Sequence, residues 1–152
     1  MRITAKVDYA VRAAIELVGA DRGAPVKGDR ISAAQDIPTK FLENILSELR
    51  RAGLVGSRRG TEGGYWLARP PGQITIADII RAVEGPLANV QGVRPEELEF
   101  TGRAEPLQRM WVCVRASLRS VLEQVTLADL AAGRLPPKVS RLADDPDAWS
   151  PR

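Results

Sequence analysis

Residues 31–67, ISAAQDIPTKFLENILSELRRAGLVGSRRGTEGGYWL, are the stretch that decides the fold. Within them, the segment from Pro38 to Ala52 repeats apolar residues at helical spacing and carries polar residues on the opposite side. Pro38 suits the first position of a helix, because the amide hydrogen that proline lacks would have no partner there. Gly53 follows two arginines and is a typical helix stop. We therefore predict a helix whose buried side consists of Phe41, Leu42, Ile45, Leu46 and Leu49.

Two short strand candidates follow this helix, from Leu54 to Arg58 and from Gly64 to Leu67. The segment between them, RGTEG, is a glycine-bounded loop. Before the helix, residues 29–35 predict a shorter helix with Asp29 as its N-cap. Helix, turn, helix and basic hairpin make a winged helix-turn-helix, whose second helix fits the major groove of DNA.

The remaining segments complete a mainly α fold with a small two-stranded wing. Helical patterns over residues 6–20 and 76–84 assign residues 1–84 to a DNA-binding domain, and residues 85–103 are a predicted irregular loop. A short helix should follow Thr126 as its N-cap. Residues 134–152 are charged and broken by proline, so we expect this tail to be partly disordered.

A long helix is predicted from Ala104 to Gln124, within a dimerisation segment that covers residues 104–133. Its apolar residues alternate spacings of four and three, which is typical of a helix that packs along another helix. Either the chain's own core or a second copy could cover this face. We expect a second copy, because two DNA half-sites require a two-fold protein. The predicted dimerisation residues are Leu107, Trp111, Val114, Leu118, Val121 and Val125.

Several separated motifs resemble the Rrf2 (Rrf-two) family of bacterial transcription regulators. The opening MRITAKVDYAV is followed by FLENILSELRRAGLV, SRRG and GGYWLA, and then by ADIIRAVEGPLA and TLADL. The resemblance covers roughly residues 1–133, with the motifs in the family's order. It implies a homodimeric repressor that binds an imperfect inverted repeat in double-stranded DNA.

The charge distribution agrees with a nucleic-acid partner. The net charge is +3, but residues 1–83 hold 13 Lys and Arg against 9 Asp and Glu, whereas residues 84–152 hold 9 against 10. The sequence has no signal-peptide or membrane-span pattern and a single cysteine, so we expect a cytoplasmic protein with no membrane partner. With no histidine, no activated nucleophile and no phosphate loop, an enzyme is not expected.

The polar side of the central helix supplies the candidates for base recognition. Asparagine can pair with adenine, glutamate can accept from cytosine, and lysine or threonine can reach phosphates or base edges. The same pattern would suit an ordinary solvated helix face. The resemblance implies that Glu43 recognises a base, whereas Pro38 stands where family members often have serine and removes a hydroxyl. The candidates are Thr39, Lys40, Glu43, Asn44 and Ser47.

Arginines near the hairpin form a second candidate set. Arginine suits the narrow minor groove of A-tracts. The resemblance implies that Arg59, directly before the wing glycine, enters that groove. Alternatively, Arg58 and Arg59 are surface arginines that pair with Glu62. The arginines at the end of the helix either contact phosphates or only terminate the helix. The set is Arg50, Arg51, Arg58, Arg59 and Gly60.

No cofactor is expected. Cluster-binding family members carry three cysteines at positions that fall near Val90, Glu99 and Glu105, and none of these is a cysteine here. Asp8, at a position where some relatives supply a carboxylate, and the distant Cys113 cannot hold a cluster within one subunit. The chain therefore resembles the cluster-free branch of the family, which contains the cysteine-metabolism repressor CymR.

Three further possibilities remain open. Cys113 is either a small buried side chain or a redox switch that neighbouring arginines activate. The acidic group Glu96, Glu97 and Glu99 either binds a divalent cation or stays solvated. CymR-like regulators associate with an enzyme of cysteine synthesis, so an effector protein or a small molecule could control this chain. An effector protein would contact residues 93–100 or the tail, and a small molecule would need a pocket beside the long helix.

Overall fold

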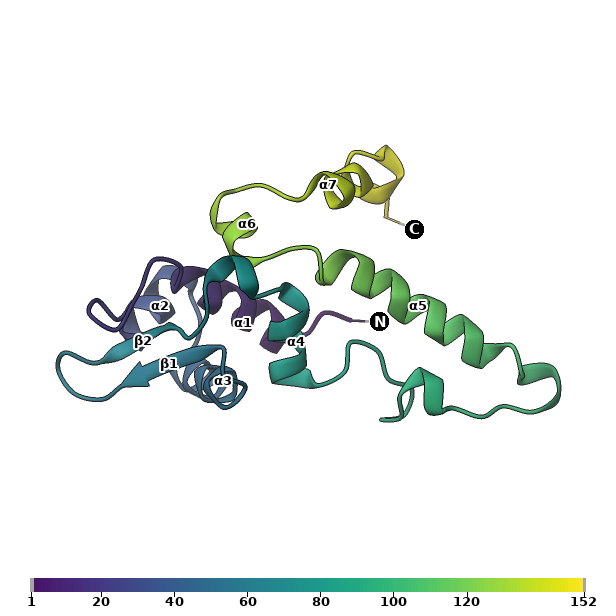
Figure 1. The fold of residues 1–152 in the computed structure, drawn as a ribbon, viewed down its shortest axis with the longest axis horizontal. Helices are drawn as coiled ribbons and strands as arrows, with labels where there is room; N and C mark the ends of the chain where they lie inside the picture. Colours follow the sequence, from purple (N-terminus) through teal and green to yellow (C-terminus); the bar gives the residue numbers. More distant parts are fainter. Residues whose placement is uncertain (1, 152) are drawn as a thin grey trace.

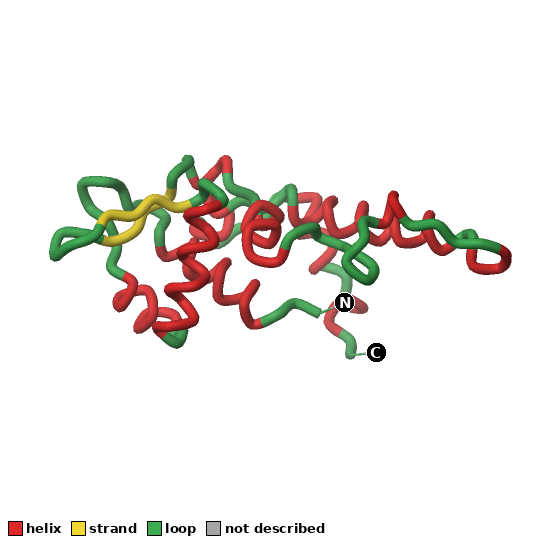
Figure 2. Tube along the Cα trace, turned by 90° about the horizontal axis from the view of Figure 1, so that it is seen from below, coloured by secondary structure: helices red, strands yellow, loops and turns green. Residues whose placement is uncertain are grey.

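The computed structural model describes residues 2–151 and is mainly helical, with one two-stranded antiparallel sheet (Figures 1 and 2). The sequence-based fold class is confirmed. None of the helices in this range is long and apolar enough to cross a membrane. The strands are β1 (Val55–Arg58) and β2 (Gly64–Leu67). The helices are α1 (Ala5–Glu16), α2 (Gly28–Gln35), α3 (Thr39–Arg51), α4 (Ile76–Glu84), α5 (Leu107–Leu122), α6 (Leu127–Ala131) and α7 (Pro137–Ala143).

The core lies where α1, α2, α3 and α4 meet. Leu17, Ile31, Leu46 and Ile79 supply fully buried side chains from the end of α1 and from the other three helices. Burying each such side chain contributes about 1.5–3 kcal/mol relative to exposing it, so the amphipathic pattern of α3 fixes which side of the helix stays exposed to solvent. Phe41 is an exception to that pattern, because it is 44% exposed and packs edge-on against Tyr9 on α1.

A backbone pairing between Thr75 and Thr126 ties the return of the chain from α5 to the core, and each of these threonines also caps a helix. α4 begins with a capping box between Thr75 and Asp78, and α6 begins with another between Thr126 and Asp129. The predicted cap at Thr126 is confirmed. Val125 was predicted to be a dimerisation residue, but this is wrong. It follows α5, accepts a hydrogen bond from the amide of Ile76 and is only 5% exposed in the core.

In the first three helices, several boundaries differ from those predicted. α1 ends at Glu16 instead of residue 20, because the chain turns there towards Gly19, which has φ +93°. α2 begins at Gly28 with Lys27 as its N-cap, so Asp29 lies in the first turn and is not the cap. Pro38 is the N-cap of α3 and not its first residue, since its ψ of 127° is extended.

α5 is shorter than predicted and extends away from the α1–α4 body (Figure 1). It has 16 residues and begins after Pro106, whereas residues 102–104 form a separate 3₁₀ turn. Sixteen residues span ~24 Å. None of its residues is fully buried, so the chain's own described residues do not enclose this helix.

The C-terminal tail, expected to be partly disordered, instead has regular structure. Residues 137–143 form α7, and Pro146–Trp149 form a 3₁₀ turn. Val139 is buried in the core, and the Trp149 indole donates a hydrogen bond to the carbonyl of Ala143 at 2.7 Å. A short apolar anchor therefore orders a segment whose composition looked unstructured.

Candidate nucleic-acid interface

The polar face of α3 is open to solvent. Thr39, Lys40, Glu43 and Asn44 are exposed, and Ser47 is partly exposed. They lie together because the opposite side of α3 packs into the core. The side chains proposed for base recognition therefore form one continuous helix face.

A short backbone pairing with the segment before α2 holds the hairpin to the body. β1 and β2 pair with Val55 opposite Leu67 and Arg58 opposite Gly64. On the other edge of β2, Val26 and Tyr65 exchange backbone hydrogen bonds of 2.9 and 2.8 Å. This pairing brings the segment before α2 alongside the wing.

The wing tip separates the roles of its two arginines. The Arg58 guanidinium donates to the backbone carbonyl of Glu62 at 2.8 Å, so it braces the turn. Arg59 is exposed and, within residues 2–151, makes no hydrogen bond or ion pair through its side chain. Gly60 has φ +100°, and its carbonyl accepts from the amide of Gly63 at 2.9 Å to close the loop. Arg59 is therefore the wing cation free to contact a ligand.

The two arginines at the end of α3 contact serines. Arg50 donates to the Ser57 hydroxyl on β1 at 3.2 Å, which links the helix to the wing. Arg51 donates to Ser47 one turn back on α3 at 3.4 Å. Both side chains stay exposed, so both keep donors for a phosphate.

A basic groove joins α3 to the wing. It encloses ≈ 380 Å³ and is lined by the side chains of Arg50, Arg58, Arg59 and Lys27, with glycines and Tyr65 completing the wall. Among residues 2–151, no carboxylate lines it. Lys27 was missed by the sequence analysis, because only the pairing of Val26 with Tyr65 brings it to the hairpin.

A second, apolar groove runs between α1, α4 and α5. It encloses ≈ 570 Å³, and its walls include Val7, Val11 and Ile80 from the body. Of the predicted dimerisation residues, Val114, Leu118 and Val121 line this groove. Leu107 and Trp111 lie nearer the N-terminal end of α5 and outside the groove; Leu107 is 37% exposed and Trp111 is half-buried.

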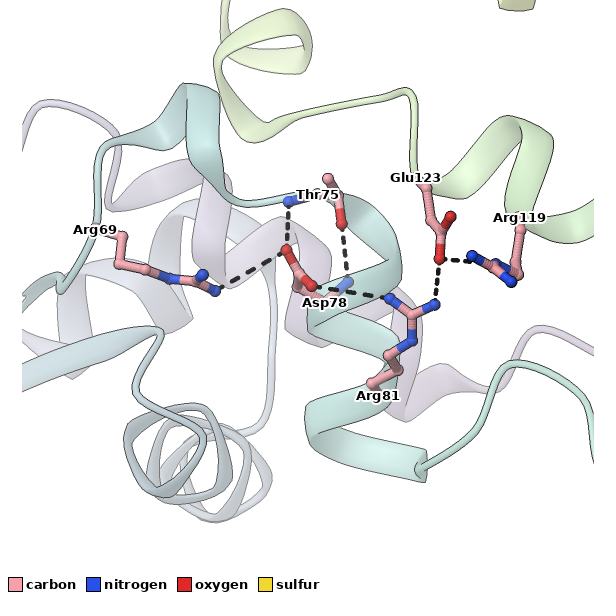
Figure 3. Close-up of polar contacts among 6 residues, drawn as sticks. All are labelled: Arg69, Thr75, Asp78, Arg81, Arg119 and Glu123. Carbon is pink, nitrogen blue, oxygen red and sulfur yellow. Dashed lines mark hydrogen bonds and ion pairs between the residues drawn. The ribbon is translucent and has the colours of Figure 1, made fainter. Parts of the chain in front are cut away.

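Charged residues link α4 to α5 (Figure 3). Glu123 accepts from Arg81 and, at 3.0 Å, from Arg119, and these two hydrogen bonds lower the pKa of its carboxyl below the ordinary range. Asp78 lies 3.9 Å from guanidinium nitrogens of both Arg69 and Arg81.

The acidic loop residues and Cys113 differ in their contacts and exposure. Glu96 is ion-paired with Arg115, and a hydrogen bond from its own backbone, followed by the Arg115 contact, lowers the pKa of its carboxyl. The expectation of only mobile, solvated charge is therefore wrong for Glu96. Glu97 and Glu99 are exposed. Cys113 is exposed on α5, so the alternative of a small buried side chain is wrong.

Comparison with known proteins gives consistent matches. A model of the Rrf2 family, described as an iron-dependent transcriptional regulator, matches residues 3–133. The chain is 51% identical over 145 residues to a Mycobacterium tuberculosis protein that carries the name HTH-type transcriptional regulator Rv1287, covering 95% of this chain and 90% of that one. It is 37% identical over 133 residues to the HTH-type transcriptional regulator CymR of Bacillus subtilis, covering 87% and 91%.

Solved structures show the same fold. The structure of CymR, the global cysteine regulator of B. subtilis, matches with a TM-score of 0.72 at 36% identity, covering 88% of this chain and 98% of that one. IscR of T. potens matches with a TM-score of 0.67 at 32% identity, covering 100% and 93%.

The residues of this chain do not fit the iron centre that the family description implies. Val90 pairs its backbone with Val93, and Glu99 and Glu105 are exposed. Asp8 forms an ion pair with Arg12 at 2.9 Å. Across residues 2–151, no three His, Cys, Asp or Glu side chains gather where they could hold a metal ion. Thiolate or imidazole ligands for a cluster are therefore missing at the expected positions.

Proposed function

Because the chain belongs to the Rrf2 family of transcriptional regulators, we propose that it represses transcription as a homodimer bound to an inverted-repeat operator. The observation that carries this proposal is the position of the exposed α3 face beside a basic groove without carboxylates. Polar side chains on a helix can hydrogen-bond base edges, and clustered cations attract phosphates.

In the proposed complex, α3 lies in the major groove. Its 13 residues span ~20 Å, which suits insertion of the Thr39–Ser47 face along the base edges. Glu43 accepts from a cytosine amino group and Asn44 pairs with adenine. Lys27, Arg50 and Arg51 contact phosphates beside the groove, which fixes the register of α3 without reading sequence.

The wing contacts the adjacent minor groove through Arg59. An arginine whose side chain has no partner in its own chain loses no internal hydrogen bond on binding. The narrow minor groove of an A-tract concentrates negative potential, which favours a guanidinium there. Arg58 stays in the protein as the brace of the turn.

A second copy of the chain covers the apolar groove between α1, α4 and α5. The support is that α5 extends from the body with no fully buried residue, while the groove beside it is lined by aliphatic side chains. Two-fold packing of α5 against a second copy would bury the exposed side of α5 and the apolar groove together. It would also place the two α3 helices on successive half-sites. Repression would follow from occupancy of a promoter, as the family resemblance implies.

The test is fluorescence anisotropy on a duplex from the DNA upstream of the gene, against a scrambled duplex, over a salt series. We expect at least ~10³-fold tighter binding to the upstream duplex. Arg59→Ala should weaken binding about tenfold and reduce the salt slope by about 1. Arg141→Ala on α7 is the matched control, because it removes an exposed arginine far along the chain from α3 and the wing.

Equal affinity for the two duplexes at every salt concentration, or equal losses for Arg59→Ala and Arg141→Ala, would contradict the proposal. In the first case the protein reads no sequence in that duplex. In the second case the wing does not contact DNA, and only the net charge of the protein determines its affinity for DNA.

A second candidate is control by a partner protein. It is favoured by exposed apolar side chains at the C-terminus, where Leu142 is 57% exposed and Trp149 is 77% exposed. CymR-like regulators set the precedent for an enzyme partner. The two candidates separate on salt, because DNA affinity falls steeply as salt rises and an apolar protein contact does not.

A further inference from the structure

We propose that a cavity between α4 and α5 binds a small molecule with at least two anionic groups, and that this ligand regulates DNA binding. The regulatory part rests on the function proposed above, whereas the binding itself does not. The cavity encloses ≈ 460 Å³, within the range of small-molecule sites. Its lining includes Arg81, Arg94, Arg115, Arg119 and Glu96.

The four arginines come from three separate segments. Arg81 lies on α4, Arg94 precedes the 3₁₀ turn Pro95–Glu97, and Arg115 and Arg119 lie one turn apart on α5. Burial of apolar side chains does not explain this convergence, because the arginines surround open space. Like charges repel one another, so gathering four guanidinium groups costs free energy unless anions offset it.

Within residues 2–151, the carboxylates that contact these arginines are too few to neutralise them. Glu96 pairs with Arg115, and Glu123, just behind the lining, pairs with Arg81 and Arg119. Arg94 makes no hydrogen bond or ion pair through its side chain within residues 2–151, although its charge acts on the Glu96 carboxylate together with that of Arg115. Even with Asp78 at 3.9 Å from Arg81, four cations face three carboxylates, one of which Arg69 also contacts. The cavity therefore keeps a positive excess and unused guanidinium N–H donors.

This arrangement recognises carboxylate or phosphoryl groups. A guanidinium presents paired donors that match two oxygens of either group. Arg94 precedes the 3₁₀ turn and Arg119 lies on α5, so a ligand with two anionic groups can contact two different segments of the lining. The Gly85–Leu87 turn adds a small apolar wall for the carbon skeleton.

A bound anion would hold α5 against the DNA-binding domain. Figure 3 shows that Arg81 on α4 and Arg119 on α5 already meet through a single carboxylate, Glu123. A ligand that also contacts Arg94 and Arg115 would add further links across the same junction. Since α5 is the proposed dimer element, its angle to α4 sets the spacing of the two α3 helices.

The binding test is isothermal titration calorimetry with sodium pyrophosphate and with sodium citrate, at fixed ionic strength and without DNA. We expect saturable binding of at least one probe, and the probe that binds distinguishes phosphoryl from carboxylate ligands. Arg94→Gln and Arg119→Gln should each weaken binding by about tenfold or more. Arg109→Gln, an exposed arginine of α5 outside the cavity, should bind as the original protein does.

The site is refuted if neither probe binds saturably, or if Arg109→Gln loses as much affinity as Arg94→Gln. Both results leave the DNA-binding proposal intact. For the regulatory part, the bound probe should change operator affinity at least about threefold in the original protein and not in Arg94→Gln. An unchanged operator affinity overturns regulation alone, and absence of operator binding overturns the proposed function alone.

Discussion

At the scale of a residue, Gly63 holds the shape of the wing. A β-carbon at this position would lie 2.1 Å from the carbonyl oxygen of Arg58 and 2.7 Å from the carbonyl carbon of Arg59. Both neighbours are backbone atoms, which cannot rotate away as a side chain can. The close approach lets the turn fold back beneath Arg59, so the exposed arginine depends on a buried glycine.

We expect Gly63→Ala to weaken operator binding by about tenfold, similar to the loss of the arginine itself, because the turn must open. It should also destabilise the fold by about 1–3 kcal/mol, as overpacking does. Anisotropy and urea unfolding measure the two effects. Gly72→Ala is the control, since its β-carbon would meet only the Ala128 methyl at 4.0 Å. Normal binding and stability in Gly63→Ala would show that the wing is not rigid there.

At the scale of an element, a charged contact joins α4 and α5 beside the apolar side chains of both helices. Glu123 joins Arg81 and Arg119, and these hydrogen bonds lower the pKa of its carboxyl in the folded protein. A carboxyl with a lower pKa when folded stabilises the fold above its unfolded pKa. That contribution is lost as the pH falls through the folded pKa, when the carboxyl takes up a proton.

Glu123→Gln should therefore lower the urea midpoint at pH 7 and have a diminishing effect as the pH falls below the ordinary carboxyl range. The difference will be modest, because the contact is partly exposed. Unfolding curves of the two proteins along a pH series measure it. Glu99→Gln, which removes an exposed carboxylate, should show no such pH-dependent difference. A midpoint difference that stays constant with pH would sink the assignment of this contact to the ionised carboxylate.

At the scale of the whole molecule, the wing and the N-terminal end of α5 lie at opposite ends of the long axis (Figures 1 and 2). One copy can thus engage DNA at one end and a partner along α5. The apolar groove lined by Leu118 is the surface that we expect a second copy to bury.

Leu118→Glu should shift the protein from dimer to monomer in analytical ultracentrifugation, because a buried, unpaired carboxylate is costly. Operator affinity should fall with it, since one copy contacts one half-site. Ser120→Glu, on the exposed side of the same helix, should leave both unchanged. Circular dichroism checks that both variants keep their helices. A Leu118→Glu protein that remains a dimer would place the subunit contact elsewhere.

Local patterns in the sequence predicted most of the helices and strands in residues 1–84. The stripe of α3, the strands around the RGTEG loop and the capping residue Thr126 were all expected, because each depends on residues a few positions apart. The predicted helix boundaries were less accurate. For example, α5 begins only after Pro106, three residues later than predicted. The prediction that Phe41 is buried was wrong, because Phe41 packs edge-on against Tyr9, which is distant in sequence, and stays partly exposed there.

The sequence by itself determined the helix with the exposed polar face, the basic hairpin and the lack of cysteines at the family's cluster-ligand positions, since spacing and residue type suffice for these. The tertiary structure decided which distant residues meet. Val125, expected to contact a second copy, lies in the core. Lys27 lies beside the wing because Val26 pairs with Tyr65. Four arginines line one cavity. Periodicity records which side of an element is apolar, but only packing determines what covers that side.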